Sequence, residues 1–353
     1  MRANLGFAFQ KEGYEVVFIC PYDEYSQQLK KHFAYVDIQI NAKGTNPTED
    51  LKTIYRYYQA YKELRPDVVL HYTIKPNIYG TIAASMLNIP SINNIAGLGT
   101  LFIKQNFVTK IAKWLYKFSQ KRAAKIFFQN SDDKELFVLN NLVDENKTDL
   151  LPGSGVDLDK FKPLETKNDS KKFVFLMVGR VLKDKGVLEL VEASKILKQK
   201  YDNFEVQLLG PVGVENRTAI TKQEVEAWVK DGLVKYLGFS DNVAQYIAQA
   251  DCVVLPSYRE GTPRSLLEAA AMAKPLIATN VVGCKEVVDD GVNGYLCEVK
   301  NAKDLADKME KMLNLSAEQR EAMGKAGREK MVKEFDEKIV IEKYSQSIDE
   351  ILK

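Results

Sequence analysis

The stretch ADCVVLPSYREGTPRSLLEAAAMAKPLIAT (250–279) contains a strand, a helix and a second strand with no long loop between them. CVVLP (252–256) and PLIAT (275–279) are short apolar runs, as expected of strands covered on both faces of a parallel sheet. The helix expected between them begins at Pro263, because proline is favoured at the first position of a helix. The stretch therefore predicts a β–α–β unit.

The same alternation extends in both directions along the chain. In the second half, further strands are predicted at 173–178, 204–209 and 234–238, with helices between them and three helical segments at the end. In the first half, strands are predicted at 15–20, 67–72, 90–95 and 124–129, and helices at 46–64, 77–87 and 107–122. Apolar strands that alternate with helices predict an α/β fold with two doubly wound, Rossmann-like sheets.

A polar segment around 158–172, which contains Pro163 and lacks periodicity, predicts a linker. We therefore expect a first Rossmann-like domain over 1–160 and a second over 161–335. A C-terminal helix over 336–353 can return to the first domain. The two sheets are expected to face each other, with ligands at the carboxyl ends of their strands.

The composition excludes several classes of protein. Apolar content of 45%, charged content of 28% and a net charge of +2 describe an ordinary globular chain with no bias toward nucleic acid. Two histidines and four scattered cysteines argue against a Cys/His zinc site and predict small buried thiols (Cys20, Cys252, Cys284 and Cys297). Without a long apolar run or a signal peptide, the expected location is the cytoplasm, with contact at the inner membrane face left open.

The helix after Gly261 carries a phosphate-type feature. Thr262 is predicted as its N-cap and Pro263 as its first residue, so the free amides of Arg264 and Ser265 point out of the helix mouth. These amides form a ready site for a phosphate group.

Two carboxylates accompany this helix. Glu260 lies just before it, and Glu268 lies inside it, where a carboxylate can accept two hydrogen bonds from a ribose diol. The alternative is a plain capped helix with a solvated Glu260 and a paired Glu268.

A second cationic feature follows another strand. Arg180 comes directly after the strand at 173–178, and Lys185 precedes Gly186 at the start of the next helix, so both cations can reach one diphosphate. The alternative is a basic turn that Gly186 caps. Two phosphate-type features at the carboxyl ends of strands in one sheet favour a functional site.

These residues lie in motifs that resemble the family 4 glycosyltransferases of the GT-B fold. The matching segments are GRVLKDKG (179–186), VKYLG (234–238), the opening 250–279 stretch, VGCKEVVDDGVNGYL (282–296), YTIKPNIYG (72–80), AGLGTLF (96–102), FFQNSDDKELF (127–137) and PGSGVDLDKF (152–161). The subgroup it is most similar to makes bacterial capsule, O-antigen and N-glycan precursors. The resemblance implies a UDP-sugar donor, a polyprenyl-diphosphate-linked acceptor, retention of configuration, and no metal or other cofactor.

The resemblance also implies roles for individual residues. Arg180 and Lys185 hold the donor diphosphate, and Glu260 lies beside the donor sugar. The remaining donor-binding positions are Gly179, Gly238 beside the uracil, Gly261, Thr262, Pro263, Arg264, Ser265 and the ribose-binding Glu268. His71 would contact the donor sugar, although a satisfied structural histidine is an equal alternative. Gly97 and Gly99 would lie on the acceptor side or simply shape a turn.

Two further segments have competing interpretations. Asp157 and Asp159 mimic a metal-binding DxD string, but their place after Gly155 favours a turn. The helix at 107–122, within the basic stretch 104–125, carries a stripe of Phe107, Ile111, Trp114, Leu115 and Phe118. This stripe is predicted to pack on the first sheet. The alternative is an interfacial surface for anionic lipid.

The start of the chain departs from the family pattern. MRANLGFAFQKEGYEVVFICP (1–21) looks like a first helix that leads into a second strand, so the opening strand of the first domain is expected to be missing. Two other functions stay open beside glycosyl transfer. One is a UDP-sugar epimerase on the same fold. The other, suggested by the missing strand, is a non-catalytic remnant that binds nucleotide sugars.

Overall fold

The computed structural model describes residues 3–40, 46–97, 107–164 and 172–353. The chain forms two compact units, a first unit of Met1–Leu151 with Val340–Lys353 and a second unit of Pro152–Ile339. The sequence prediction placed these divisions at 160 and 335. The C-terminal segment is therefore part of the first unit.

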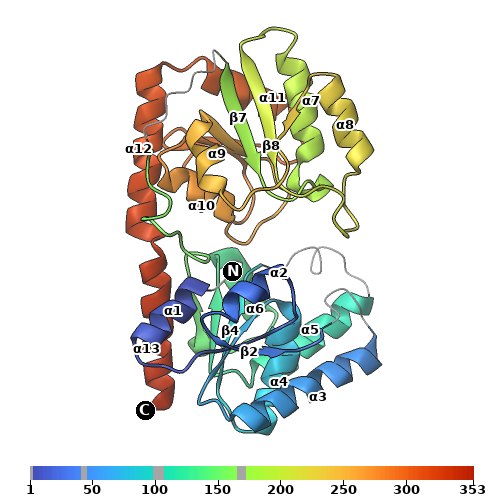
Figure 1. Cartoon of the computed structure of the whole chain (residues 1–353), viewed down its shortest axis with the longest axis vertical. Coiled ribbons are helices and arrows are strands. Elements are labelled where there is room, and N and C mark those ends of the chain that lie inside the picture. The colour runs from blue at the N-terminus through green and yellow to red at the C-terminus, as the bar shows by residue number, and fades with distance from the viewer. Residues whose placement is uncertain (1–2, 41–45, 98–106, 165–171) are drawn as a thin grey trace. The chain divides into compact units, whose positions relative to one another are not determined.

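The first unit contains parallel strands and helices in alternation (Figure 1). Its elements are α1 (Ala3–Lys11), β1 (Val17–Cys20), α2 (Glu24–Leu29), β2 (Ala34–Asp37), α3 (Pro47–Leu64), β3 (Val69–Tyr72), η1 (Pro76–Gly80), α4 (Thr81–Met86), β4 (Ser91–Ile95), α5 (Phe107–Gln120), β5 (Lys125–Phe128), α6 (Ser131–Leu139), η2 (Glu145–Lys147), β6 (Thr148–Leu150) and α13 (Glu337–Leu352). The strands form one sheet of order β3-β4-β5-β6 and a separate pair, β1-β2.

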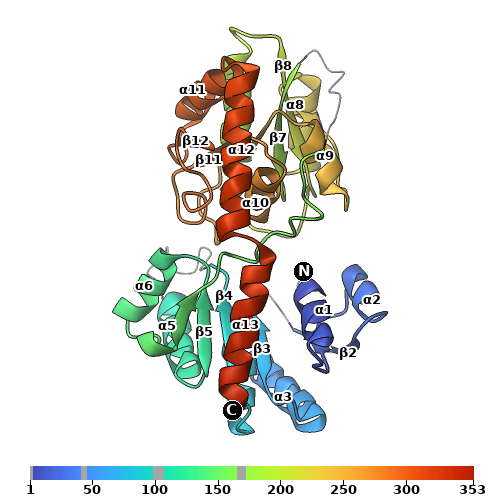
Figure 2. The same cartoon turned by 90° about the vertical axis from the view of Figure 1, so that its left-hand side faces the viewer.

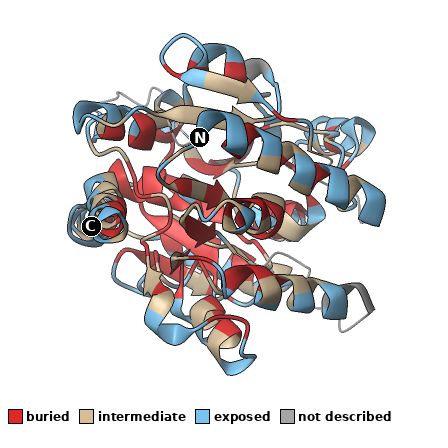
Figure 3. Cartoon of the chain, turned by 90° about the horizontal axis from the view of Figure 1, so that it is seen from below, coloured by how far each residue is buried: buried red, intermediate tan, exposed pale blue. Residues whose placement is uncertain are grey.

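Side chains alternate between the two faces of the four-stranded sheet, as the pleat requires. Ile126 and Phe128 of β5 pack with residues of α3, α4, α5 and α6 on one face. Phe127 points to the other face, where α1 and α13 supply Leu5 and Tyr344. Figure 2 shows α13 lying along this sheet, and Figure 3 shows the buried residues gathered on the central strands. The last helix therefore completes a core that begins at the other end of the chain.

The second unit is a single doubly wound sheet. Its elements are β7 (Phe173–Val178), η3 (Lys183–Lys185), α7 (Val187–Leu197), β8 (Phe204–Leu209), α8 (Lys222–Lys230), β9 (Lys235–Tyr236), α9 (Val243–Gln249), β10 (Cys252–Leu255), α10 (Arg264–Ala271), β11 (Leu276–Thr279), β12 (Gly294–Cys297), α11 (Ala302–Leu313) and α12 (Ala317–Glu334). All strand pairs are parallel, in the order β12-β11-β10-β7-β8-β9. Helices α7 and α8 cover one face, and α9, α10 and α12 cover the other (Figure 1).

The α/β prediction is confirmed, and three of the four cysteines are buried free thiols, with Cys20 half-buried. In the first unit, β1 pairs with β2 and β3 pairs with β4, and no ladder joins β1 to β3 in the described residues. That the opening strand is missing stays a prediction. Across the described ranges, no helix is long and apolar enough to cross a membrane.

The prediction that the stripe on the helix at 107–122 packs on the first sheet holds only in part. Leu115 packs against the core, but Ile111 and Trp114 are exposed. Tyr116, Ser119 and Gln120, which are not in the stripe, are buried. The side chain of Phe107 lies outside the described residues. Helix α5 therefore contacts the core mainly through a face beside the apolar stripe.

The first unit should depend on Tyr344 of α13 for its stability. The Tyr344 ring is fully buried against Phe127, with ring centroids 5.0 Å apart, and its hydroxyl accepts from Asn94 Nδ2 at 2.9 Å. Tyr344→Ala should lower the free energy of unfolding by about 3–5 kcal/mol, as for other buried aromatic truncations. Urea denaturation followed by circular dichroism measures it. Gln346→Ala, at an exposed site on the same helix, is the control and should change stability by less than about 0.5 kcal/mol.

Candidate donor-nucleotide site

Glycines follow the neighbouring strands of the second unit, and their lack of side chains lets the loops after these strands lie close together. Gly179 follows β7, and a Cβ on Gly210, which follows β8, would lie 2.0 Å from the Gly179 carbonyl oxygen. Gly210 N–H donates to the Gly238 carbonyl at 2.7 Å. The predicted positions Gly179 and Gly238 are thus joined through Gly210, which the sequence analysis missed. A glycine directly after an apolar strand was the signal that could have found it.

The loop that carries Lys185 is held against the end of β10. Gly186 adopts a positive φ of 73°, and a Cβ there would lie 1.9 Å from the Pro256 carbonyl oxygen. Tyr258 N–H donates to the Asp184 carbonyl at 2.9 Å. These backbone contacts bring the residues after β7 and the residues after β10 into one site.

Lys185 and Glu260 form an ion pair across this junction. Their side chains are only 22% and 12% exposed, and Ser257 Oγ donates a further hydrogen bond to the same Glu260 oxygen. The alternative of a solvated Glu260 is therefore wrong. A partly buried carboxylate that accepts from two donors fixes the direction of the lysine side chain.

The backbone around Glu260 is fixed by a second loop. Glu260 N–H donates to the Val282 carbonyl at 3.2 Å, and a Cβ on Gly283 would lie 2.2 Å from the Gly261 carbonyl oxygen. Only glycine therefore permits this approach at position 283.

Helix α10 begins one residue later than predicted. Pro263 is the N-cap and Arg264 the first helical residue, so Thr262 precedes the cap. Thr262 is buried, and a Cβ on Gly153 would lie 2.6 Å from the Thr262 Cβ. The amides of Arg264 and Ser265 still belong to the first turn, where the helix leaves them without intrahelical acceptors.

Glu268 faces inward from this helix and is 9% exposed. Arg264 Nη2 donates to its Oε1 at 3.1 Å, which is the pairing that the structural alternative proposed. Burial raises the pKa of the Glu268 carboxyl, and the nearby Arg264 charge opposes that shift. A buried carboxylate at a helix mouth is a strong acceptor for hydroxyl groups once it is ionised.

Arg180 is exposed at the carboxyl end of β7. Within the described ranges it forms no hydrogen bond or ion pair. Its charge is therefore available to a ligand, unlike that of Lys185, which Glu260 already compensates.

His71 lies in the first unit, away from solvent. Its Nε2 accepts from the Tyr61 hydroxyl at 2.8 Å, and its Nδ1 donates to Asn93 Oδ1 at 2.9 Å. Burial lowers its pKa to about 4, so the ring is neutral. Gly80 packs so close to the ring that a Cβ there would lie 2.5 Å from Nε2, so a ligand cannot reach the ring from this side. This geometry favours the structural alternative for His71 over contact with the donor sugar.

Three other predicted positions have simpler outcomes. Gly97 adopts a positive φ of 122°, as a turn requires, and Gly99 lies outside the described residues. Asp157 Oδ1 accepts from the amides of Asp159 at 3.0 Å and Lys160 at 2.8 Å. The Asp157-Leu-Asp159 string therefore forms the predicted turn.

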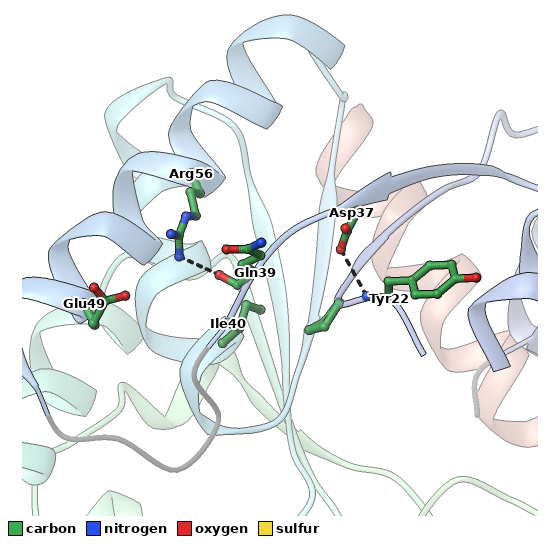
Figure 4. Close-up of a pocket in the computed structure, with 7 residues that line it drawn as sticks. Tyr22, Asp37, Gln39, Ile40, Glu49 and Arg56 are labelled. Carbon is green, nitrogen blue, oxygen red and sulfur yellow. Dashed lines mark hydrogen bonds between the residues drawn. The ribbon is translucent and has the colours of Figure 1, made fainter. Parts of the chain in front are cut away.

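The first unit contains a pocket of about 410 Å³ at the carboxyl ends of β1 and β2 (Figure 4). Arg56 from α3 donates to the Gln39 carbonyl at 2.8 Å, and Asp37 Oδ1 accepts from Tyr22 N–H at 3.0 Å. The Tyr22 ring is 54% exposed. The pocket presents charged, amide and aromatic groups together, a mixture that suits a polar ligand.

Two Rossmann-like units, one with a cationic site at its strand ends, agree with the predicted GT-B fold. Residues 159–330 match the family described as "Glycosyl transferases group 1", and residues 4–130 match "Glycosyl transferase 4-like". The chain belongs to this family of group 1, or family 4, glycosyltransferases.

Two of its relatives are named for transfer of a sugar to a diphospho-undecaprenol-linked acceptor. The chain is 30% identical, over 96% of its length and 92% of the relative, to N,N'-diacetylbacillosaminyl-diphospho-undecaprenol alpha-1,3-N-acetylgalactosaminyltransferase of Campylobacter jejuni. It is 28% identical, over 82% of its length and 76% of the relative, to UDP-Gal:alpha-D-GlcNAc-diphosphoundecaprenol alpha-1,3-galactosyltransferase of Escherichia coli. Anabaena HepE, solved with UDP and glucose, has the same fold, with a TM-score of 0.82 at 18% identity over 98% of this chain and 95% of that one.

The contact at Gly186 should control the stability of the second unit. Gly186→Ala adds both a strained positive φ and a clash with the Pro256 carbonyl. Gly232→Ala is the matched control, because Gly232 has a φ of +66° but open space where a Cβ would stand. We expect Gly232→Ala to cost about 1–2 kcal/mol and Gly186→Ala to cost at least about 1 kcal/mol more. Equal shifts of the urea midpoint in the two variants would contradict the close approach.

Proposed function

We propose that the protein transfers a hexose or N-acetylhexosamine from a UDP-sugar to a polyprenyl-diphosphate-linked glycan precursor, with retention of configuration. The observation that carries the proposal is that the free Arg180 charge and the Lys185–Glu260 pair both lie in loops that follow strands of one sheet. Two relatives named for diphosphoundecaprenol-linked acceptors support the acceptor class. The UDP-Gal donor in one of those names, and UDP in the HepE structure, support the nucleotide.

Cleavage of the donor builds negative charge on the departing UDP. In the proposed mechanism, Arg180 and Lys185 stabilise this charge, and the free amides of Arg264 and Ser265 add their dipoles. These two side chains neutralise the charge on UDP, so no metal is assigned to the step. Glu260 orients Lys185 beside the donor sugar.

The bond changes balance without a protein nucleophile. The acceptor hydroxyl forms a bond to the anomeric carbon on the face from which UDP departs, and the carbon–oxygen bond to the diphosphate breaks. The hydroxyl proton passes to a diphosphate oxygen of UDP. The products are the extended glycan and UDP.

The acceptor is assigned to the first unit, at the carboxyl ends of its strands. The pocket lined by Tyr22, Asp37 and Arg56 is a candidate for the acceptor sugar. The charged side chains of the pocket offer hydrogen bonds to the hydroxyls of a sugar.

Arg180 should be required for transfer but not for folding. Arg180→Ala should lower kcat by roughly a hundredfold or more, as when one preorganised charge-stabilising group is lost. Transfer of labelled sugar from UDP-sugar into a lipid extract measures it, and Lys230→Ala on exposed α8 is the control. A normal kcat would remove Arg180 from the mechanism. UDP-sugar conversion without labelled lipid would favour an epimerase, and binding without turnover would favour a non-catalytic protein.

UDP binding should weaken on acidification because of Glu268. Its raised pKa means that it takes up a proton at a higher pH than an ordinary glutamate, and the neutral carboxyl accepts the ribose diol less well. Glu268→Gln should bind UDP roughly tenfold more weakly. Calorimetry on the full chain across the acidic range should show a steeper loss of affinity for the natural protein than for Glu268→Gln. Parallel curves would return Glu268 to a structural role, because titration of the UDP phosphates is common to both.

A further inference from the structure

Helix α5 exposes an apolar stripe instead of burying it. The stripe consists of Ile111, Trp114 and Phe118, and the first two side chains are 44% and 62% exposed. The rings of Trp114 and Phe118 are stacked, with centroids 5.5 Å apart and planes at 16°. The Arg122 guanidinium lies 3.7 Å above the Phe118 ring. The stripe is thus an ordered row of rings that ends in a cation.

The opposite face of the helix fixes this orientation. Tyr116 packs edge-on against Phe137, with centroids 5.2 Å apart. Gln120 Nε2 donates to the Asn77 carbonyl at 2.8 Å, and Gln120 Oε1 accepts from Asn93 Nδ2 at 2.7 Å. Rotation of the helix to bury Trp114 would break these buried hydrogen bonds, which is costly. The exposure of the stripe is therefore built into the fold.

A row of cations runs beside the stripe. Lys110, Lys117 and Lys121 are exposed, and they follow one another at helical spacings of seven and four residues. Within the part of the chain that the structure describes, none of the three forms an ion pair. The sequence has no acidic residue between Asp67 and Asp132, so the helix has no negative charge of its own to offset the row.

We propose that this face of α5 docks on the surface of an anionic lipid bilayer. Aromatic and aliphatic side chains beside a row of lysines are the features of helices that lie in the membrane interface. The rings would enter the headgroup region, and Lys110, Lys117, Lys121 and Arg122 would contact lipid phosphates. The inference deepens the proposed function and rests on it for one point, that the acceptor is itself attached to a lipid.

A second copy of the chain is a poorer occupant of the face. In a two-fold symmetric contact the same patch meets itself, so the lysine row of one protomer would approach that of the other. Like charges brought together across an interface are unfavourable. Anionic lipid instead supplies the complementary charge over the whole row, and the attachment is expected to weaken as salt rises.

Trp114 can report its own docking. The chain has two tryptophans, so Trp228→Phe leaves Trp114 as the sole emitter. Vesicles that contain phosphatidylglycerol should shift its emission to shorter wavelength, and vesicles of phosphatidylcholine alone should not. No shift, or an equal shift with both vesicles, overturns the proposal. A shift that grows with protein concentration without lipid also overturns it, in favour of self-association.

Separate variants test the lysine row and the apolar stripe of this face. Lys117→Glu with Lys121→Glu should lower partitioning into anionic vesicles at least about tenfold. The control, Lys222→Glu with Lys230→Glu on exposed α8, should not. In cosedimentation, Phe118→Ser should weaken binding, whereas Tyr55→Ser, at a 62% exposed tyrosine on α3, should leave it unchanged. Equal effects of α5 variants and their controls would overturn the assignment.

The vesicles contain neither donor nor acceptor, so these measurements do not depend on catalysis. If vesicle binding fails while labelled sugar is still transferred to the lipid extract, only the membrane inference falls. If vesicle binding is found but no sugar is transferred, only the proposed function falls. Circular dichroism of each variant confirms that a loss of binding does not come from unfolding.

Discussion

The ion pair between Lys185 and Glu260 joins two loops that leave different strands of one sheet. It depends on a backbone approach that only glycine permits, since any Cβ at Gly186 would overlap the Pro256 carbonyl. Ser257 completes the surroundings of the carboxylate. Because a half-buried ion pair is stable only with good geometry, the packing of these loops and the direction of the lysine determine each other. Lys185 is held by this arrangement, whereas Arg180, in the same loop after β7, keeps an uncompensated charge.

Much of the second unit could be predicted from sequence because its strands are continuous apolar runs. Those at 173–178 and 204–209 match β7 and β8 residue for residue. The missed strands are short: β12 (Gly294–Cys297) begins with glycine, and β2 (Ala34–Asp37) has no fully buried residue. Local sequence pattern gives a weak signal where a short strand lacks a run of buried apolar residues and pairs with a segment distant in the chain.

The sequence singled out the residues of the candidate site but not their pairing. It marked Glu260 as a candidate beside a ligand, and only the fold shows that Glu260 pairs with Lys185. His71 was also marked, but in the fold its ring lies in a buried hydrogen-bond network with Tyr61 and Asn93. For α5, Leu115 packs on the core as predicted, whereas buried hydrogen bonds of the Gln120 amide hold the helix in an orientation that leaves Trp114 exposed. Side-chain direction depends on tertiary contacts, which sequence spacing does not supply.

The return of the last helix to the first unit has a consequence for synthesis on the ribosome. The second unit, Pro152–Ile339, is continuous in sequence and can fold as soon as it has been made. The first unit is encoded first, but its core lacks Val340, Tyr344 and Ile348 until the final residues emerge from the exit tunnel. Until then, while the whole second unit is translated, one apolar face of its sheet is covered by α1 but not by α13. The unit made first is therefore the one finished last, and chaperones that shield apolar surface would meet it during that interval.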